Sequence, residues 1–169
     1  EALGLRWSDI NFKNHTIMIS NTVTQMRTLL IDEHTKSFTS HRMLSVMDDV
    51  IGYFKRLKAQ QEANKREYGD KYHDSDSVCV WPDGRIILPG YVSHNFKKLL
   101  QKYDLPEIRF HDLRHTAGSL LLAQGVNIKQ IQEFLGHADV TTTLNIYTHI
   151  DEDAKKETAA AMGKVLKLV

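Results

Sequence analysis

The chain has 169 residues, which is long enough for one domain with a sizeable hydrophobic core. Hydrophobic residues make up 41% and charged residues 25%, as in an ordinary globular protein, and no apolar run approaches the roughly 18 residues that would span a membrane. The formal net charge of +1 means that any nucleic-acid surface must come from local clusters of basic residues, and the single cysteine, Cys79, excludes an intrachain disulfide and a cysteine-based metal cage.

The first 46 residues predict the end of a helix followed by a small antiparallel sheet. Residues 1–7 have the pattern of an amphipathic helix, and Ser8-Asp9 breaks it. Alternating and β-branched residues then predict strands at about 10–12, 16–20, 22–25 and 43–46. Asn14-His15 is a plausible hairpin turn. The segment 35–40, which contains Lys36, is expected in or beside a turn of this sheet.

The middle of the chain predicts one helix and one short strand. The helix is expected from about Asp48, because carboxylates suit the first turn and apolar residues follow at helical spacing. Residues 62–76 are polar and predict a frayed helix end and a loop. The apolar run 78–81 predicts a short buried strand, which Pro82-Asp83-Gly84 closes as a turn.

Helical patterns dominate from Pro89 onward. Pro89 suits the first turn of a helix that carries Lys97, Lys98 and Lys102 on its basic side. A second helix is expected over about 111–124, with Gly125 as its stop. Asn127 is predicted to cap a third helix that ends at Gly136. Beyond it, Asp139 is expected to cap a helix that carries Tyr147, and 151–169 is expected to be a helical tail with an apolar end.

Five residues form a candidate site for phosphodiester chemistry. Cleavage by a side chain needs a nucleophile, cations around the phosphate and a proton donor for the leaving oxygen. Tyr147 offers a phenol as the nucleophile, and Arg114 offers a planar, permanent cation for two phosphate oxygens. His111 lies three residues before Arg114, so the start of a helix would place both on one face. His137 follows a glycine at a predicted helix end, and Lys36 lies in a predicted turn from which it could reach the leaving 5′-oxygen.

Each of these residues also has an ordinary structural interpretation. Arg114 alone would suit a surface ion pair, and Tyr147 alone would suit a half-buried position. His111 and His115 have the i, i+4 spacing of a zinc site, but the residue after His111 is an aspartate where the metalloprotease helix has a glutamate. The three lysines of the helix that follows Pro89 fit a solvated face and a DNA-phosphate contact equally well.

The motifs together resemble the catalytic domain of the tyrosine recombinase, or phage integrase, family. The resemblance covers nearly the whole chain and rests on Glu1-Ala2-Leu3-Gly4-Leu5-Arg6-Trp7-Ser8-Asp9-Ile10, Thr35-Lys36-Ser37 with Ser40 and Arg42, His111-x-x-Arg114-His115, Leu135-Gly136-His137, and Tyr147 ten residues after His137. In the family, a first catalytic arginine lies three residues before the position of Glu1. We therefore expect residues 1–169 to be a fragment of the catalytic domain that lacks this arginine and the family's N-terminal DNA-binding domains.

The resemblance implies a fold and an activity. The fold is expected to be α+β and mostly helical, with a small antiparallel sheet near the N-terminal side. The implied reaction is site-specific recombination or integration of double-stranded DNA through a 3′-phosphotyrosine. It uses Tyr147 as nucleophile, Arg114 as phosphate clamp, His111 as general base or phosphate contact, His137 as phosphate hydrogen-bond donor and Lys36 as general acid, with no metal or cofactor.

The resemblance also implies partners and a setting. Family members act as tetramers on DNA, and the tail 151–169 suits a contact with a neighbouring protomer or a fold back onto its own core. A bacterial or phage-encoded mobile element and a cytoplasmic location are expected, since neither a signal peptide nor a membrane span is visible. Two alternatives stay open: a type IB topoisomerase that relaxes DNA, and a DNA-binding or assembly fragment without catalysis.

Overall fold

The computed structural model describes residues 1–25, 29–32 and 41–136. Three of the sequence predictions lie outside these residues: the turn that carries Lys36, the helix that carries Tyr147 and the tail 151–169. Within the described residues the fold is α+β and mostly helical with small antiparallel sheets, which confirms the predicted fold class. None of the helices in this part of the chain is long and apolar enough to cross a membrane.

The chain begins with two short 3-10 turns, η1 (Ala2–Gly4) and η2 (Trp7–Asp9), and the predicted helix over residues 1–7 is wrong. Leu5 between the turns is extended, and its carbonyl accepts a hydrogen bond of 3.0 Å from the Val78 amide. The Trp7 amide donates to the Asp76 carbonyl at 2.8 Å. The backbone here pairs with residues 76–78, which are distant in sequence, so an apolar pattern of helical period was not enough to form a helix.

The strands form two sheets where one was predicted. β1 (Ile10–Asn11), β2 (Thr16–Ile19) and β5 (Arg42–Ser45) make a three-stranded antiparallel sheet in the order β1-β2-β5. β3 (Thr22–Gln25) pairs separately with β4 (Leu29–Asp32), a strand that the sequence analysis did not predict. The expected hairpin turn between β1 and β2 is confirmed, and His15 adopts a positive φ of 53° there.

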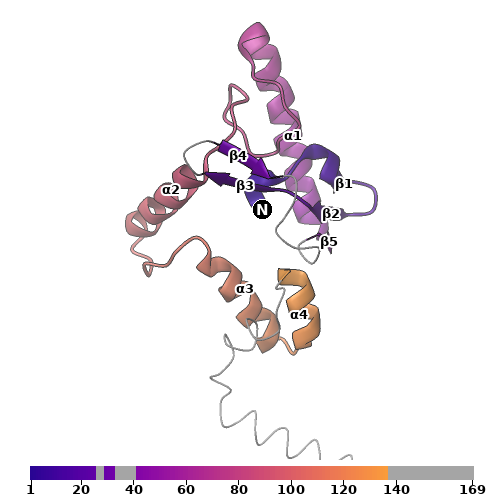
Figure 1. Ribbon diagram of the computed structural model, residues 1–169, viewed down its shortest axis with the longest axis vertical. Coiled ribbons are helices and arrows are strands. Elements are labelled where there is room, and N and C mark those ends of the chain that lie inside the picture. The colour runs from indigo at the N-terminus through magenta and orange to yellow at the C-terminus, as the bar shows by residue number, and fades with distance from the viewer. Residues whose placement is uncertain (26–28, 33–40, 137–169) are drawn as a thin grey trace, which may run out of the picture.

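The long helix α1 (Asp48–Tyr68) covers the three-stranded sheet and then projects beyond it (Figure 1). Its start at Asp48 is confirmed, but the predicted frayed end from residue 62 is wrong. Residues 62–67 are alanine, asparagine and long charged residues, most of which favour helix, and the helix continues until Gly69 ends it with a φ of 52°. The short 3-10 turn η4 (Gly69–Lys71) follows.

The main core lies between α1 and the three-stranded sheet. Its buried members are Ile10, Ile17, Ile51 and Val78, and Trp7, Phe54 and other partly buried apolar residues pack around them. Val78 is buried as predicted, but residues 78–81 form only an isolated bridge, between Val80 and Ile86, and not a strand. The turn at Pro82-Asp83-Gly84 is confirmed by the hydrogen bond from the Gly84 amide to the Trp81 carbonyl.

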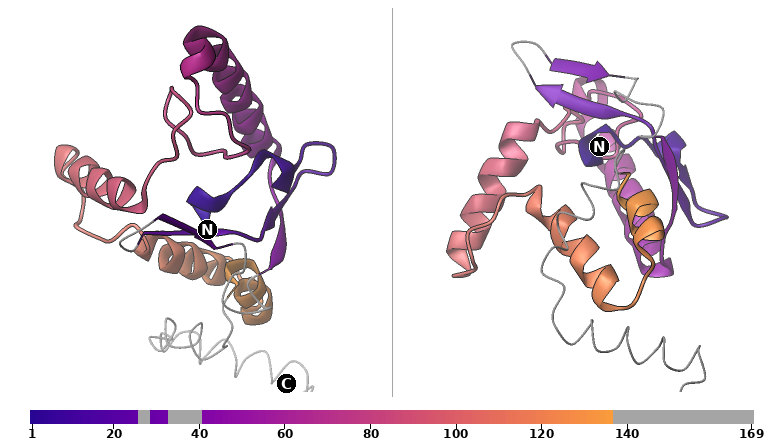
Figure 2. Two further views of the ribbon diagram at one scale, coloured as in Figure 1. Left: turned by 45° about the horizontal axis from the view of Figure 1, so that its top comes forward. Right: turned by 60° about the horizontal axis from the view of Figure 1, so that its bottom comes forward.

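Three helices make up the rest of the described chain: α2 (Pro89–Lys102), α3 (Asp112–Ala123) and α4 (Ile128–Leu135). Their predicted ends are confirmed. Pro89 occupies the first turn of α2, the Asn127 side chain accepts from the Lys129 amide at 2.8 Å, and Gly136 ends α4 in the left-handed conformation. α3 and α4 lie side by side, and α4 contacts β5 of the sheet (Figures 1 and 2).

The substitution Ile51→Ala tests the core. Ile51 is 2% exposed, so truncation should lower the free energy of unfolding by about 2–5 kcal/mol because it removes apolar burial and leaves a cavity. Leu120→Ala is the matched control: this side chain is 63% exposed, and its loss should cost about 0.5 kcal/mol or less. Urea unfolding followed by circular dichroism measures both, and equal losses would contradict the assigned core.

Candidate active site

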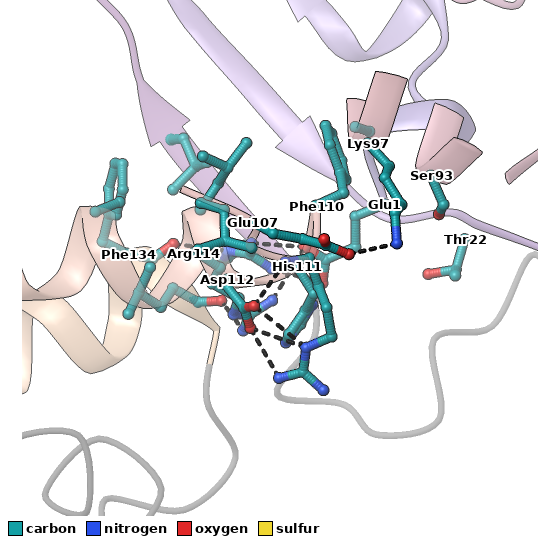
Figure 3. Close-up of a pocket in the computed structure, with 18 residues that line it drawn as sticks. Glu1, Thr22, Ser93, Lys97, Glu107, Phe110, His111, Asp112, Arg114 and Phe134 are labelled. Carbon is teal, nitrogen blue, oxygen red and sulfur yellow. Dashed lines mark hydrogen bonds and ion pairs between the residues drawn. The ribbon is translucent and has the colours of Figure 1, made fainter. Parts of the chain in front are cut away.

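An open pocket of about 1410 Å³ lies between the start of the chain, β5 and the helices α2, α3 and α4. Its polar lining includes Glu1, Arg42, Lys97, His111 and Arg114, several of which are seen in Figure 3. The structure thus brings together two of the five predicted site residues, His111 and Arg114. The other three, Lys36, His137 and Tyr147, lie outside the described residues.

His111 and Arg114 both come from the start of α3. His111 is the N-cap residue, and its carbonyl accepts a hydrogen bond of 3.0 Å from the Arg114 amide. This single helical turn directs both side chains to the pocket, as their spacing predicted. The His111 ring is exposed to solvent, whereas the Arg114 side chain is 23% exposed.

Arg114 is held by groups from other parts of the chain, among them Leu135 and Glu1. Its Nη2 donates to the carbonyl of Leu135 in the last turn of α4, and its Nη1 lies 3.6 Å from Oε2 of Glu1. Burial lowers the pKa of the Arg114 guanidinium, and the Glu1 carboxylate acts in the opposite direction. Arginine stays charged under such shifts, so the pocket keeps a fixed cation.

Arg42 is the site residue whose position the sequence analysis missed. In the sequence Arg42 is only one member of a family motif, yet from β5 its Nη1 and Nη2 donate to the two carboxylate oxygens of Glu1 at 3.2 and 2.9 Å. Its Nε donates to the carbonyl of Phe134 at 3.0 Å. No local signal could have shown this, because the partners are 41 and 92 positions away in sequence.

The Glu1 carboxylate is shared between these two arginines. Burial raises the pKa of Glu1, but the hydrogen bond from Arg42 and the charges of Arg42 and Arg114 outweigh it, and the net shift is downward. Glu1 is therefore an anion at neutral pH. The two guanidiniums can lie close together because the carboxylate between them compensates the positive charge of each.

His115, the second histidine of the motif, lies next to His111. The two rings meet edge to face with centroids 5.4 Å apart. Nδ1 of His115 is buried and has no hydrogen-bond partner among the described residues. The part of the chain that the structure describes contains no group of three or more side chains placed to hold a metal ion.

Ion pairs compensate several other charges around the pocket. Lys97 of α2 pairs with Glu107, so only part of the predicted basic side of α2 carries uncompensated charge (Figure 3). Arg109 pairs with Asp112 in the first turn of α3 at 2.8 Å, and the Arg109 amide also donates to the Asp112 carboxylate at 2.8 Å. The side-chain and backbone hydrogen bonds from Arg109 lower the pKa of Asp112 to about 2.

The pKa of Asp112 can be tested by titration. Because the folded-state pKa lies below the ordinary 3.8, the pair stabilises the fold above that value and loses its effect as the pH falls toward 2. The carboxyl-carbon NMR shift of Asp112 should therefore stay at its ionised value down to pH 4, close to the midpoint of an ordinary aspartate. Arg109→Gln should move the titration upward toward that midpoint without reaching it, because the backbone hydrogen bond from residue 109 remains, and an unchanged curve in this variant would contradict the assigned side-chain cause.

Comparison with known proteins identifies the family. The model of the phage integrase family matches residues 1–154. A tyrosine recombinase XerC-like protein of Caldanaerobacter subterraneus subsp. tengcongensis is 28% identical over 162 residues, covering 89% of this chain and 41% of that protein. The ICEBs1 integrase of Bacillus subtilis is 29% identical over 166 residues, covering 98% of this chain and 45% of that protein. The chain thus spans less than half the length of these relatives.

Solved structures agree on the fold. The Tn1549 transposon integrase in complex with transposon right end DNA superposes with a TM-score of 0.77 and 23% identity, over 98% of this chain and 53% of that one. The XerA recombinase gives a TM-score of 0.67 and 21% identity, over 96% of this chain and 52% of that one. The family model covers most of the chain and the fold is that of the recombinase structures: the chain belongs to the phage integrase family.

Proposed function

We propose that residues 1–169 form a catalytic-domain fragment of a site-specific recombinase that cuts and rejoins DNA through Tyr147. The observation that carries the proposal is the pocket itself. In a chain of the phage integrase family, it gathers a partly buried arginine, Arg114, and an exposed histidine, His111, on one helical turn. The pocket also reaches Leu135 at the end of α4, two residues before His137.

The proposed reaction exchanges one phosphate ester for another. The Tyr147 hydroxyl gives its proton to His111 and attacks the phosphorus, while the bond to the 5′-oxygen breaks and Lys36 protonates that oxygen. Arg114 and His137 stabilise the charge on the non-bridging oxygens. A 5′-hydroxyl then gives its proton to Lys36 and attacks the 3′-phosphotyrosine, and Tyr147 leaves as His111 returns the proton to it. Each broken P–O bond is replaced by another, so the exchange needs no nucleotide as an energy source, and the proposed steps assign the phosphate charge to Arg114 and His137 without a metal ion.

Double-stranded DNA is the proposed substrate and partner. Solved structures of similar recombinases contain DNA, and the pocket here is open and has a guanidinium within it. Lys98 and Lys102 are exposed on α2 and are available for phosphate contacts.

We further propose that the full-length protein assembles as a tetramer on DNA, that the tail 151–169 contacts a neighbouring protomer, and that the protein works in the bacterial cytoplasm for a mobile element.

Trapping of the covalent intermediate tests the nucleophile. The full-length protein that carries these residues is incubated with a nicked suicide duplex built from the ends of its mobile element. Wild-type protein should form a protein–DNA adduct visible by denaturing gel electrophoresis, and Tyr147→Phe should form none, since phenylalanine has no hydroxyl. An adduct with Tyr147→Phe would disprove the assignment.

Relaxation of any supercoiled plasmid without site dependence would favour the topoisomerase alternative, and DNA binding without an adduct would favour the assembly fragment.

Leaving-group chemistry tests Lys36. Lys36→Ala should slow cleavage of ordinary DNA by about 100- to 10,000-fold, the usual contribution of a general acid. A substrate whose 5′-leaving group needs no protonation, such as a 5′-bridging phosphorothiolate, should restore most of this loss. Arg114→Ala is the matched control, because the same substrate should not rescue loss of the phosphate clamp. Failure to rescue Lys36→Ala would remove Lys36 from the role of general acid.

A further inference from the structure

We propose that Lys97 is a further DNA-binding residue, whose ammonium exchanges the Glu107 carboxylate for a phosphate of the DNA backbone when the duplex enters the pocket. The inference deepens the proposed function and rests on it, because the ligand is the same duplex DNA. Glu107 thereby sets how tightly the pocket binds DNA, since Lys97 contacts a phosphate only after its ion pair with Glu107 has been broken. Both residues line the pocket that also contains His111 and Arg114 (Figure 3).

The Glu107 carboxylate differs from the carboxylates of Glu1 and Asp112, which also line the pocket. Glu1 accepts hydrogen bonds from an arginine of β5, and Asp112 accepts one from a backbone amide in the turn before α3, so both connect parts of the fold. Among the residues that the structure describes, the Glu107 side chain has Lys97 as its one hydrogen-bond or ion-pair partner. A carboxylate that supports no backbone group acts mainly through its charge, and this charge lies beside a proposed site for an anion.

The ion pair is of a kind that a phosphate can replace. The Lys97 side chain is 54% exposed and that of Glu107 is 64% exposed, so water screens the attraction between them. An ion pair this exposed contributes little to stability, whereas duplex DNA presents a dense row of phosphates whose counterions are released when lysines take their place. The lysine ammonium is carried on a flexible stem, so the exchange needs only a rotation of the side chain.

Lys97 approaches the pocket from a different helix than the proposed catalytic residues. Ser93 and Lys97 are four residues apart on α2 and both line the pocket, so this face of α2 is directed toward it. His111 lines the pocket from the start of α3. A duplex whose scissile phosphate lies at the start of α3 therefore passes the α2 side of the pocket, where Lys97 is a pocket-lining cation and Lys98 and Lys102 are not.

Breaking the ion pair leaves α2 joined to the segment before α3. The rings of Phe96 and Phe110 meet edge to face with centroids 5.4 Å apart. The Leu105 amide donates to the Leu100 carbonyl at 2.9 Å. Neither contact involves a member of the ion pair, so substitution of Glu107 should change the charge of the pocket and leave its fold intact.

Binding measurements on single and double variants of the full-length protein test the exchange. The Kd for a fluorescent duplex built from the ends of its mobile element is read from fluorescence anisotropy. At about 0.1 M salt, Glu107→Gln should tighten binding by about 5-fold, because the carboxylate no longer repels DNA and Lys97 no longer has an ion pair to break. In the Lys97→Gln background, Glu107→Gln should tighten binding by only about 2-fold, because the repulsion alone is removed. In the Glu107→Gln background, Lys97→Gln should lower the slope of log Kd against log salt by about 0.9, the value of one phosphate contact.

Asp74→Asn is the matched control. Asp74 forms a similarly exposed ion pair with Lys65, neither residue lines the pocket, and the substitution removes one negative charge as Glu107→Gln does. Its Kd at about 0.1 M salt should stay within about 1.5-fold of the wild-type value, because salt screens charges that lie beyond a Debye length.

The outcomes separate this inference from the proposed function. A wild-type protein that binds the duplex but forms no covalent adduct would contradict the proposed chemistry, and the Kd values would still decide the role of Lys97. A wild-type protein that binds no duplex would overturn both. Where the wild type binds, an equal gain from Glu107→Gln in both backgrounds would show that the ion pair persists in the complex, and an unchanged salt slope would show that Lys97 meets no phosphate. Either result overturns the inference.

Discussion

The site depends on one carboxylate between two guanidiniums. Glu1 is the point at which the start of the chain, the sheet and the helical layer meet, because Arg42 comes from β5 and Arg114 from α3. Two arginines so close together repel each other, and removing the shared anion would leave both cations partly buried without compensation. The position of the predicted phosphate clamp is therefore set by an electrostatic balance and not by packing alone.

This electrostatic balance matters because few apolar side chains are buried in the helical layer that α3 and α4 form. Ile131 and Leu135 are buried in α4, but Leu113, Leu120 and Phe134 in the same layer are each more than 40% exposed. The main core lies elsewhere, between α1 and the three-stranded sheet. The hydrogen bond from Arg42 of β5 to the Phe134 carbonyl thus connects the well-packed half of the fold to a more loosely packed one, and the bond from Arg114 joins α3 to α4 within the latter.

The chemistry available in the pocket depends on which of its charged side chains already form ion pairs with each other. Asp112 is occupied by Arg109 and Lys97 by Glu107, so neither pair offers a simple ion to a ligand. His111 is exposed at the N-cap of α3 and Arg114 lies one turn further, and both line an open pocket of about 1410 Å³. A fixed cation beside an exposed imidazole suits the stabilisation of a transferring phosphate, which supports the proposed strand exchange.

The local sequence predicted correctly those features that depend on interactions between residues close together in the chain. Pro89, Asn127 and Gly136 marked the helix ends correctly because capping and left-handed turns depend on neighbours within a few residues. The strands that pack on the core were predicted from alternation, and the spacing of His111 and Arg114 predicted their shared side of α3. The family itself could be recognised because its motifs keep a fixed order along the chain.

Only the tertiary structure decided which distant groups meet. Residues 1–7 have a helical pattern but pair with the segment around Asp76, β3 leaves the first sheet to pair with β4, and Glu1 meets Arg42 across 41 positions. Each outcome depends on competition between hydrogen-bond or charge partners that become neighbours only after folding. The sequence by itself therefore determined the family, the ends of α2, α3 and α4 and the shared side of His111 and Arg114, and folding determined that the Glu1 carboxylate lies between Arg42 and Arg114.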